Sequence, residues 1–326
     1  MSVIDAIIQG IVQGLTEFLP VSSSGHLAIT QHILGASGEN NLFFNVMLHV
    51  GTLVAVVAFY HKLIWSLIKE FFSMLKDIFT GKFRWKNMNY ERNLIMMLII
   101  GLLPLFLLFI PVPGTDLQIK DYADILSASP ILIVTAISLL ITSTLLTIGI
   151  VCNRKIAKNP EKYRHMKSFV TKKEDGTVIA GKESFNVTDA ILVGLMQFAA
   201  ALFPGLSRSG STLAVGEMRG INKQKALDYT FVLGIPSILA AALLETVDAV
   251  KAPGGLQFDP IVIIVGMVVS AIVGYIAIII FKWFLKSDKM EIFVIYTAIV
   301  GIVFIIISII EMNTGVNLFT GAPIVW

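Results

Sequence analysis

Long apolar stretches alternate with short polar segments along the whole chain. A helix needs about 20 apolar residues to cross the hydrocarbon core of a bilayer. Six stretches have this length and are largely free of charged residues, which predicts six transmembrane helices. They lie at 42–60, 93–112, 130–151, 229–247, 260–281 and 292–310.

Two further segments, 3–34 and 187–222, have a broken apolar pattern. In each, an apolar run stops at a proline, Pro20 or Pro204, and a stretch rich in serine and glycine follows before a second short apolar run. Irregular backbone at membrane depth is tolerated only where protein buries it or where it lines a cavity. We therefore expect two re-entrant helical hairpins.

The two broken segments resemble each other. Residues 3–20 laid over 187–204 give identities at Val3/Val187, Asp5/Asp189, Ala6/Ala190, Ile7/Ile191, Gly10/Gly194, Gln13/Gln197 and Pro20/Pro204. Three spans separate the copies, so the second copy enters from the opposite face. This predicts an all-α polytopic membrane protein with an inverted-topology repeat. Its parts are 1–151 (first repeat), 152–186 (cytoplasmic loop) and 187–326 (second repeat).

Composition supports a membrane protein. Of 326 residues, 56% are hydrophobic and 14% are charged, whereas about a quarter of the residues of a soluble protein are charged. A soluble enzyme and a nucleic-acid binder are therefore excluded. The single cysteine, Cys152, excludes a disulfide framework.

Charge assigns the loops to sides of the membrane. Segment 61–92 has seven Lys or Arg against three acids, 152–185 has nine against four, and 282–291 carries three lysines. Segments 113–129 and 248–259 have more acids than bases. By the positive-inside rule, the first three are cytoplasmic and the last two face outward.

Ionisable groups inside membrane segments indicate a functional site. Glu17, with Gln13 one turn before it, offers oxygen ligands for a hard cation. Arg208 at a helix start suits an oxyanion. His26, three residues after Ser23, can act as a base. The serines and glycines around them are candidate phosphate ligands: Ser22, Ser24, Gly25, Ser207, Ser209, Gly210, Ser211 and Thr212. Together they indicate phosphoryl chemistry.

Structural roles remain open for several of these residues. Serine and glycine in membrane helices often serve close packing, and Arg208 can be a buried ion-pair partner of Glu17. We interpret His49 as a packing residue, with a direct role as the alternative. Asp5 and Asp189 each open a helix, so we expect them to cap it.

Two strings, "QGLTEFLPVSSSGH" (Gln13 to His26) and "PGLSRSGST" (Pro204 to Thr212), closely resemble the signature motifs of the bacitracin-resistance family of integral-membrane undecaprenyl-diphosphatases. The string "LHVGTLVAV" (Leu48 to Val56) extends the resemblance. It implies six spans plus two re-entrant hairpins, and hydrolysis of undecaprenyl diphosphate to the monophosphate and phosphate. That reaction recycles the lipid carrier for wall synthesis.

The resemblance also implies site roles. Glu17, Ser23, His26 and Arg208 are the expected catalytic residues, and Glu17 with Gln13 is expected to hold Mg²⁺ or Ca²⁺. Many family members carry Glu at the position of Gln13, so we expect weaker metal binding here, with Glu17 as the main ligand. The expected location is the bacterial cell membrane, with the site open to the outer face; a homodimer is allowed.

Two other classes of membrane protein share features with this sequence. A membrane acid phosphatase also carries a Ser-Gly-His string, but it needs basic residues upstream and a histidine downstream. No Lys or Arg precedes Ser22 and no His follows Arg208, which argues against a membrane acid phosphatase. The alternative function is a flippase for a polyprenyl phosphate carrier, because inverted repeats with broken helices are a transporter architecture.

Overall fold

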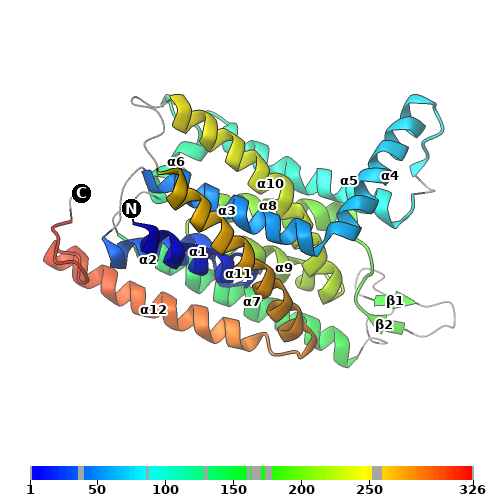
Figure 1. The fold of residues 1–326 in the computed structure, drawn as a ribbon. Helices are drawn as coiled ribbons and strands as arrows, with labels where there is room; N and C mark the ends of the chain where they lie inside the picture. The colour runs from blue at the N-terminus through cyan, green and yellow to red at the C-terminus, as the bar shows by residue number, and fades with distance from the viewer. Residues whose placement is uncertain are drawn as a thin grey trace.

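The structure is a computed structural model that describes residues 2–35, 40–85, 88–127, 129, 131–159, 162, 170–172, 178–251 and 259–324. Helices packed side by side form the fold, with one small pair of strands at one end (Figure 1). The elements are α1 (Val3–Phe18), α2 (Ser23–Leu34), α3 (Asn40–Phe59), α4 (His61–Phe79), α5 (Tyr90–Leu102), the 3₁₀ helix η2 (Leu103–Phe109), α6 (Ile119–Ser127), α7 (Ile133–Lys158), β1 (Val170–Lys172), β2 (Val178–Ala180), α8 (Val187–Leu202), α9 (Arg208–Met218), α10 (Lys223–Lys251), α11 (Pro260–Lys286) and α12 (Glu291–Thr314).

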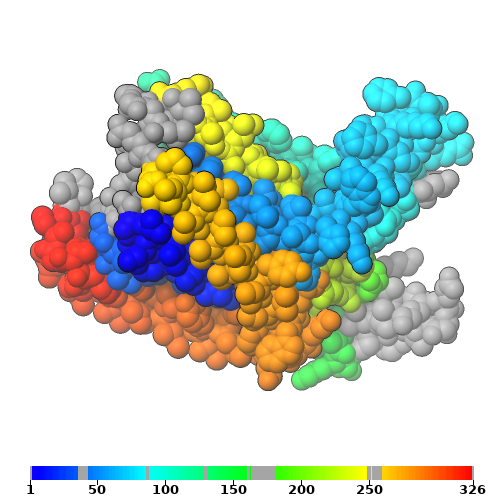
Figure 2. Space-filling view, in the orientation of Figure 1, coloured from blue at the N-terminus to red at the C-terminus, as the bar shows by residue number. Residues whose placement is uncertain are grey.

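Each of the six predicted spans falls on a helix: α3, α5 continued by η2, α7, α10, α11 and α12. Within the described residues, five of these are long and apolar enough to cross a membrane, and a sixth is added when α3 is joined to α4. Helices α11 and α12 form much of the face in Figure 2. In these two helices, isoleucines such as Ile264, Ile272, Ile299 and Ile306 are more than half exposed. The prediction of an all-α polytopic membrane protein is confirmed.

The segment 61–92, expected as a loop, begins with the 19-residue helix α4, so that expectation is wrong for 61–79. This helix is bent 84° from α3 and projects from the bundle (Figures 1 and 2). The aromatic residues Trp65, Phe72 and Phe79 recur every seven residues, as do Lys62, Lys69 and Lys76. Seven residues are nearly two helical turns, so each set forms a stripe on α4. Counting charges alone missed this period.

Both predicted hairpins break where the sequence places a proline. The first, α1 with α2, turns at Pro20, and the second, α8 with α9, turns at Pro204. Proline cannot donate to a helix and stops it. After each turn a serine caps the next helix: Ser22 Oγ accepts from the Gly25 N–H (3.2 Å), and Ser207 Oγ accepts from the Gly210 N–H (3.0 Å).

The hairpins enter the bundle from opposite ends, and their tips meet inside it (Figure 1). Gly205 N–H donates to Ser24 Oγ at 3.3 Å, and Ser209 Oγ donates to the Leu19 carbonyl at 3.1 Å. Gly205 has φ +88° and lies against Thr135, whose Cα would be 2.8 Å from an added Cβ. A side chain at this position would force the two tips and α7 apart.

The helix starts behave alike in the two hairpins. Asp5 forms a capping box with Ser2, and Asp189 forms one with Asn186, so the expected capping roles are confirmed. Gly10 in α1 packs against the Gly266 carbonyl of α11, and its counterpart Gly194 in α8 packs against Gly101 of α5. The inverted repeat of the two halves and their boundaries at 151 and 187 stay predictions.

The predicted loop 152–186 holds more structure than expected. Helix α7 continues to Lys158, and β1 pairs antiparallel with β2 in the register Thr171 to Ile179. Much of the remaining loop lies outside the described residues. At its end, Lys182 and Arg219 both pair with the buried Asp189, which ties the loop to the base of the second hairpin.

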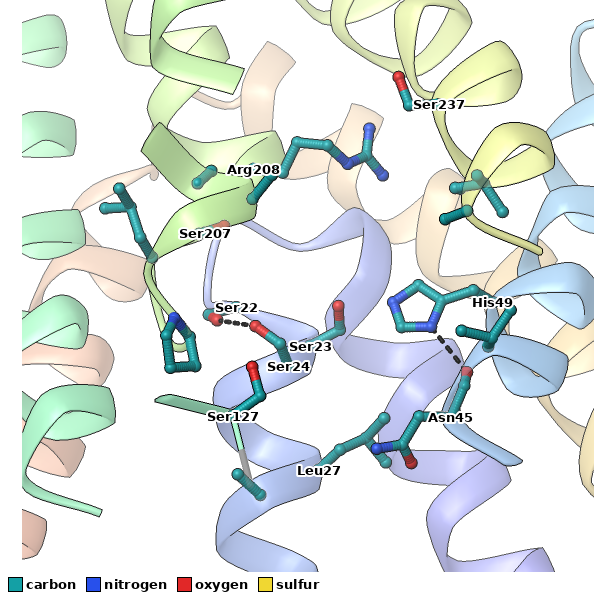
Figure 3. A pocket seen from close by; sticks show the side chains of 18 of the residues that line it. Ser22, Ser23, Ser24, Leu27, Asn45, His49, Ser127, Ser207, Arg208 and Ser237 are labelled. Carbon is teal, nitrogen blue, oxygen red and sulfur yellow. Dashed lines mark hydrogen bonds between the residues drawn. The ribbon is translucent and has the colours of Figure 1, made fainter. Parts of the chain in front are cut away.

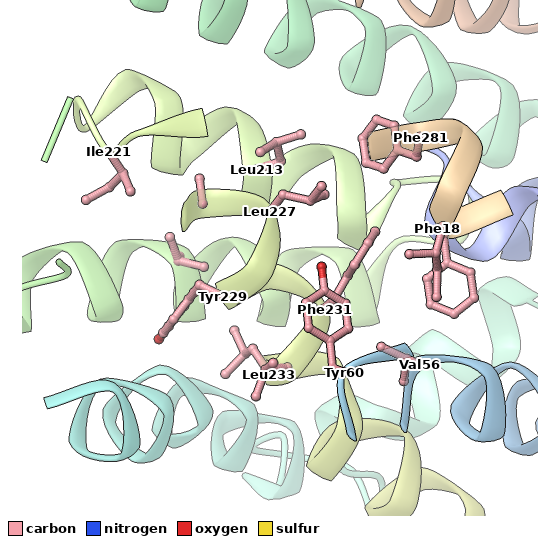
Figure 4. Packing of buried hydrophobic residues seen from close by; sticks show 14 of the residues in the cluster. Phe18, Val56, Tyr60, Leu213, Ile221, Leu227, Tyr229, Phe231, Leu233 and Phe281 are labelled. Carbon is pink, nitrogen blue, oxygen red and sulfur yellow. The ribbon is translucent and has the colours of Figure 1, made fainter. Parts of the chain in front are cut away.

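Aromatic residues fill the core around the end of α1 (Figure 4). The rings of Phe18 and Phe231 meet edge to face with centroids 5.3 Å apart, and Phe231 also contacts Tyr60 and Phe281. Edge-to-face pairs of this kind add about 1 kcal/mol beyond burial. Because Phe18 directly follows Glu17, this packing fixes the end of α1 that carries the carboxylate.

Candidate functional site

A cavity of about 470 Å³ lies where the tips of the two hairpins meet (Figure 3). One part of its wall is polar and comes from both hairpins and from α3. The other part is largely apolar and comes from η2, α8 and α10. The polar part contains Glu17, Ser22, Ser23, Ser24, Asn45, His49, Ser207, Arg208 and Ser209; the apolar part contains Leu105, Leu108, Phe109, Ala200, Ala201, Ile238, Ala240, Ala241 and Leu244.

Glu17 is the centre of the polar part. Its side chain is 3% exposed. The Oε2 atom accepts hydrogen bonds from Ser23 Oγ at 2.7 Å and from Gln13 Nε2 at 3.0 Å, while Oε1 is ion-paired with Arg208. A buried carboxylate is stable only when it is paired in this way. The structure therefore brings three of the four predicted catalytic residues into direct contact.

Arg208 is the first residue of α9 and points into the cavity (Figure 3). Nη2 pairs with Glu17, which agrees with the alternative that Arg208 is a buried ion-pair partner of this carboxylate. Nη1 is buried and has no hydrogen-bond partner among the described residues. Its guanidinium lies against Gly234 of α10, where an added Cβ would collide with it. Nη2 is thus held by Glu17, whereas Nη1 lies against α10 and has no hydrogen-bond partner within the described residues.

The predicted phosphate ligands divide into two groups. Ser22, Ser24, Ser207 and Ser209 line the cavity. The hydroxyls of Ser211 and Thr212 instead donate to carbonyls of Ser207 and Arg208, both at 2.6 Å. The backbone N–H groups of Gly25 and Gly210 donate to the capping serines Ser22 and Ser207. In this structure the second group shapes the hairpin tips.

His26 is engaged away from the carboxylate. Its Nδ1 lies 2.7 Å from the Ser22 carbonyl, and its Nε2 lies 2.8 Å from the hydroxyl of Tyr296 in α12. The two rings are stacked with centroids 5.5 Å apart. These contacts hold the Ser22 turn against α12. The predicted role of His26 as a base stays a prediction.

His49 is the histidine nearest to Glu17, and the sequence analysis favoured a packing role for it. Its Nε2 lies 3.4 Å from Glu17 Oε2, and its Nδ1 lies 2.7 Å from the Asn45 carbonyl. The ring points into the cavity (Figure 3). A signal was available, because an ionisable residue in the middle of a span is by default a functional candidate. Gln197, which also lines the cavity, was missed although the repeat pairs it with Gln13.

Within the described residues, no group of three or more His, Cys, Asp or Glu side chains is arranged to hold a metal ion. Oxygen donors are present in smaller number. Glu17 supplies a carboxylate, and Gln13 Oε1 is buried without a hydrogen-bond partner in the described part of the chain.

Fold and site together define a class: a polytopic helical membrane protein with a cavity that is lined by a carboxylate, a guanidinium and hydroxyls. The chain belongs to the bacitracin resistance protein BacA family, whose model matches residues 6–303. This confirms the resemblance seen in the two motifs.

Several curated relatives of the chain are named undecaprenyl-diphosphatase. The chain is 37% identical to the undecaprenyl-diphosphatase of Alkaliphilus metalliredigens over 310 residues, which cover 95% of this chain and 100% of the relative. It is 34% identical to the undecaprenyl-diphosphatase of Bacteroides fragilis, with 93% and 97% covered. It is 32% identical to the undecaprenyl-diphosphatase of Methanosphaera stadtmanae, with 95% and 99% covered.

Proposed function

We propose that the protein hydrolyses undecaprenyl diphosphate to undecaprenyl phosphate and inorganic phosphate. The observation that carries this proposal is the contact of Glu17, Ser23 and Arg208 inside a cavity with an apolar wall. Such a site fits a substrate with a phosphate head and a hydrocarbon tail. The relatives' names supply the identity of that substrate. The reaction recycles the lipid carrier of cell-wall synthesis and confers resistance to bacitracin.

Positioning and charge supply most of the catalysis in phosphoryl transfer. Arg208 binds the terminal phosphate through its guanidinium and stabilises the charge that develops on the phosphate oxygens. Ser207, the N-cap of the same helix, donates its hydroxyl hydrogen bond, and the positive end of the helix dipole adds to it. These groups act on the phosphate that leaves as inorganic phosphate. Ser209 keeps its hydroxyl on the Leu19 carbonyl and holds the two hairpin tips together.

Ser23 stands next to the reacting phosphorus in this proposal. Its hydroxyl donates to Glu17 Oε2 at 2.7 Å, so the carboxylate can take the proton as the oxygen attacks. The new bond joins that oxygen to the terminal phosphorus, and the bond to the bridging oxygen breaks to release undecaprenyl phosphate. If the Ser23 oxygen attacks, a phosphoserine forms, and a water then attacks its phosphorus and breaks the bond to the Ser23 oxygen to release inorganic phosphate. If Ser23 instead orients a water, the attack of that water releases inorganic phosphate directly. His26 keeps the Ser22 turn in place. Its predicted role as a base is tested by the phosphate-release assay described below.

The donor set fits a hard divalent cation that takes several ligands from the substrate. Mg²⁺ is often held by one or two carboxylates together with substrate phosphates. Glu17 and the unpartnered Gln13 Oε1 would be the protein ligands of Mg²⁺ or Ca²⁺. When bound, the ion would neutralise phosphate charge.

The apolar wall is the proposed path of the prenyl tail. The cavity volume of about 470 Å³ lies in the range of about 300–1,000 Å³ that is usual for sites of small, drug-sized ligands, and a C55 chain is much larger than such a ligand. The head and the first few isoprene units would occupy the cavity, and the rest of the tail would lie among lipids beside α10 and η2.

We place the site in a bacterial cell membrane, open to the outer face. The cavity lining reaches from Arg208 to Ser127 and Ser129, next to the acidic segment 113–129. The basic segments lie at the other end of the bundle (Figure 1). Starting from a Cys152→Ser protein, Ser127→Cys should react with an impermeant maleimide on intact cells. Lys289→Cys should react only after permeabilisation, and the reverse pattern would contradict this orientation.

A phosphate-release assay tests the activity. The purified protein should release phosphate from undecaprenyl diphosphate, and EDTA should suppress the release. Glu17→Ala and Arg208→Ala should each lose it. Full activity in both variants would refute the site.

The flippase alternative is favoured by one observation, the entry of the two hairpins from opposite ends. Proteoliposomes separate the two functions. Phosphate release without transbilayer movement of the carrier supports the phosphatase, and movement without phosphate release supports the flippase.

A further inference from the structure

Gln197 in α8 is a buried amide with nothing in the protein to bind. Its side chain is 2% exposed, and it lines the cavity. Neither Nε2 nor Oε1 has a hydrogen-bond partner among the described residues. Leaving a buried polar group unpaired costs about 1–3 kcal/mol, so such groups are rare. An unpaired amide that faces a cavity indicates a ligand.

The internal repeat explains why this amide is unpaired. Gln13 and Gln197 occupy corresponding positions, but the residue four positions later differs: it is Glu17 in the first hairpin and Ala201 in the second. Side chains at i and i+4 are neighbours on a helix. The Gln13 amide therefore donates to Glu17 at 3.0 Å, whereas the methyl of Ala201 gives Gln197 no partner and leaves space on the cavity side.

The surroundings of Gln197 belong to the apolar part of the cavity. Gly194, one turn before it, packs against Gly101 and Pro104 at the start of η2. Positions i and i+3 share a helix face, so Gln197 faces the same wall. The cavity lining from η2 and from the turn of α8 that follows Gln197 is apolar (Leu105, Leu108, Ala200 and Ala201).

We propose that the Gln197 amide N–H binds the lipid-linked phosphate, the one that remains on the prenyl chain. This rests on the proposed function. In a prenyl diphosphate, that phosphate lies between the terminal phosphate and the hydrocarbon, and Gln197 lines the cavity that the charged groups and the apolar wall share. A neutral amide suits this phosphate, because it holds the product without adding charge near the hydrocarbon.

Two ligands separate this phosphate from the terminal one. A short prenyl monophosphate carries only the lipid-linked phosphate, and inorganic phosphate resembles only the terminal one. Gln197→Met keeps the length of the side chain and removes the amide. We expect it to weaken binding of the prenyl monophosphate by about tenfold, the loss of one hydrogen bond to a charged group, and to change inorganic phosphate binding less than about twofold.

Ser237→Ala is the matched control. Ser237 lines the same cavity, but its hydroxyl donates to the Leu233 carbonyl at 3.0 Å, so both affinities should stay as in the wild type. Unchanged monophosphate binding in Gln197→Met would overturn the proposal, and the amide would then hold only water. An equal loss for both ligands would overturn it as well.

Gln197→Glu gives a second measurement with a side chain of the same shape. Its carboxylate repels a phosphate, so monophosphate binding should fall further than in Gln197→Met; equal or tighter binding would contradict the proposal. Direct binding does not require turnover. A wild-type protein that binds the monophosphate but releases no phosphate would refute the proposed function alone.

Discussion

The carboxylate of Glu17 and the guanidinium of Arg208 form an ion pair across 191 residues of chain. Each comes from the tip of a different hairpin, and the hairpins enter the bundle from opposite ends. The pair therefore joins the two halves of the protein at the cavity. Its members are 3% and 22% exposed, so neither charge is well solvated without the other.

Removing one charge of this pair should cost both activity and stability. Glu17→Gln or Arg208→Met leaves the other charge buried without its partner, a cost of about 3 kcal/mol. The double variant Glu17→Gln/Arg208→Met should recover much of that stability, because no net charge stays buried, and should still release no phosphate. Thermal unfolding in detergent and phosphate release measure the two effects.

The control for these single and double variants is Glu291→Gln. Glu291 pairs with Arg154, and the two side chains are 44% and 38% exposed, so the change should cost less than about 1 kcal/mol. A double variant no more stable than the single ones would show that the pair is not the source of the loss.

Gly234 should be essential for the position of Arg208. A Cβ at this position would collide with the guanidinium, so Gly234→Ala should push it away from Glu17 and lower kcat/KM by about tenfold or more. Gly301→Ala is the control, because its Cβ would also be crowded, by Leu140 at 2.8 Å in a region between α7 and α12. Gly301→Ala should lower the melting temperature and leave KM unchanged; equal kinetic losses would contradict the assignment.

The turn between α11 and α12 offers a test of pH dependence. Burial raises the pKa of Asp288, but Lys223 and Arg154 outweigh it and hold the pKa below its ordinary value of 3.8. Asp288 has φ +55°, which asparagine also accepts, so Asp288→Asn removes only the charge. The wild type should be more stable above pH 4 by less than about 1 kcal/mol.

The sign of this dependence follows from the lowered pKa. A carboxyl group whose pKa is lowered by folding stabilises the fold when it is ionised, and loses that contribution as the pH falls through the folded-state pKa. The stability difference between wild type and Asp288→Asn should therefore shrink below pH 4. A constant difference from pH 7 to pH 3 would show that the charge of Asp288 does not cause it.

The sequence predicted the architecture because hydrophobic length and the prolines at 20 and 204 act locally. The same holds for the site residues carried by the two motifs. The charge count did not predict α4, because the charges of this segment suggested a loop. The repeat of aromatic residues and of lysines every seven residues is the signal that indicates a helix there. The direction of each ring also escaped prediction: the His49 ring lies against Glu17, whereas Tyr296 holds the His26 ring against α12. Such rotations depend on tertiary contacts.

His49 should contribute to turnover through its contact with Glu17. The Nε2 atom lies 3.4 Å from Glu17 Oε2, and taking a polar partner away from a buried charge is strongly unfavourable. His49→Leu should therefore lower kcat/KM by about tenfold or more. His49→Gln retains an N–H group of similar reach and should keep activity within about threefold of the wild type. His61→Leu is the control, because His61 is exposed at the start of α4, and it should not change activity. Equal losses in the Leu and Gln variants of His49 would mean that ring packing, and not the polar contact, is what Glu17 requires.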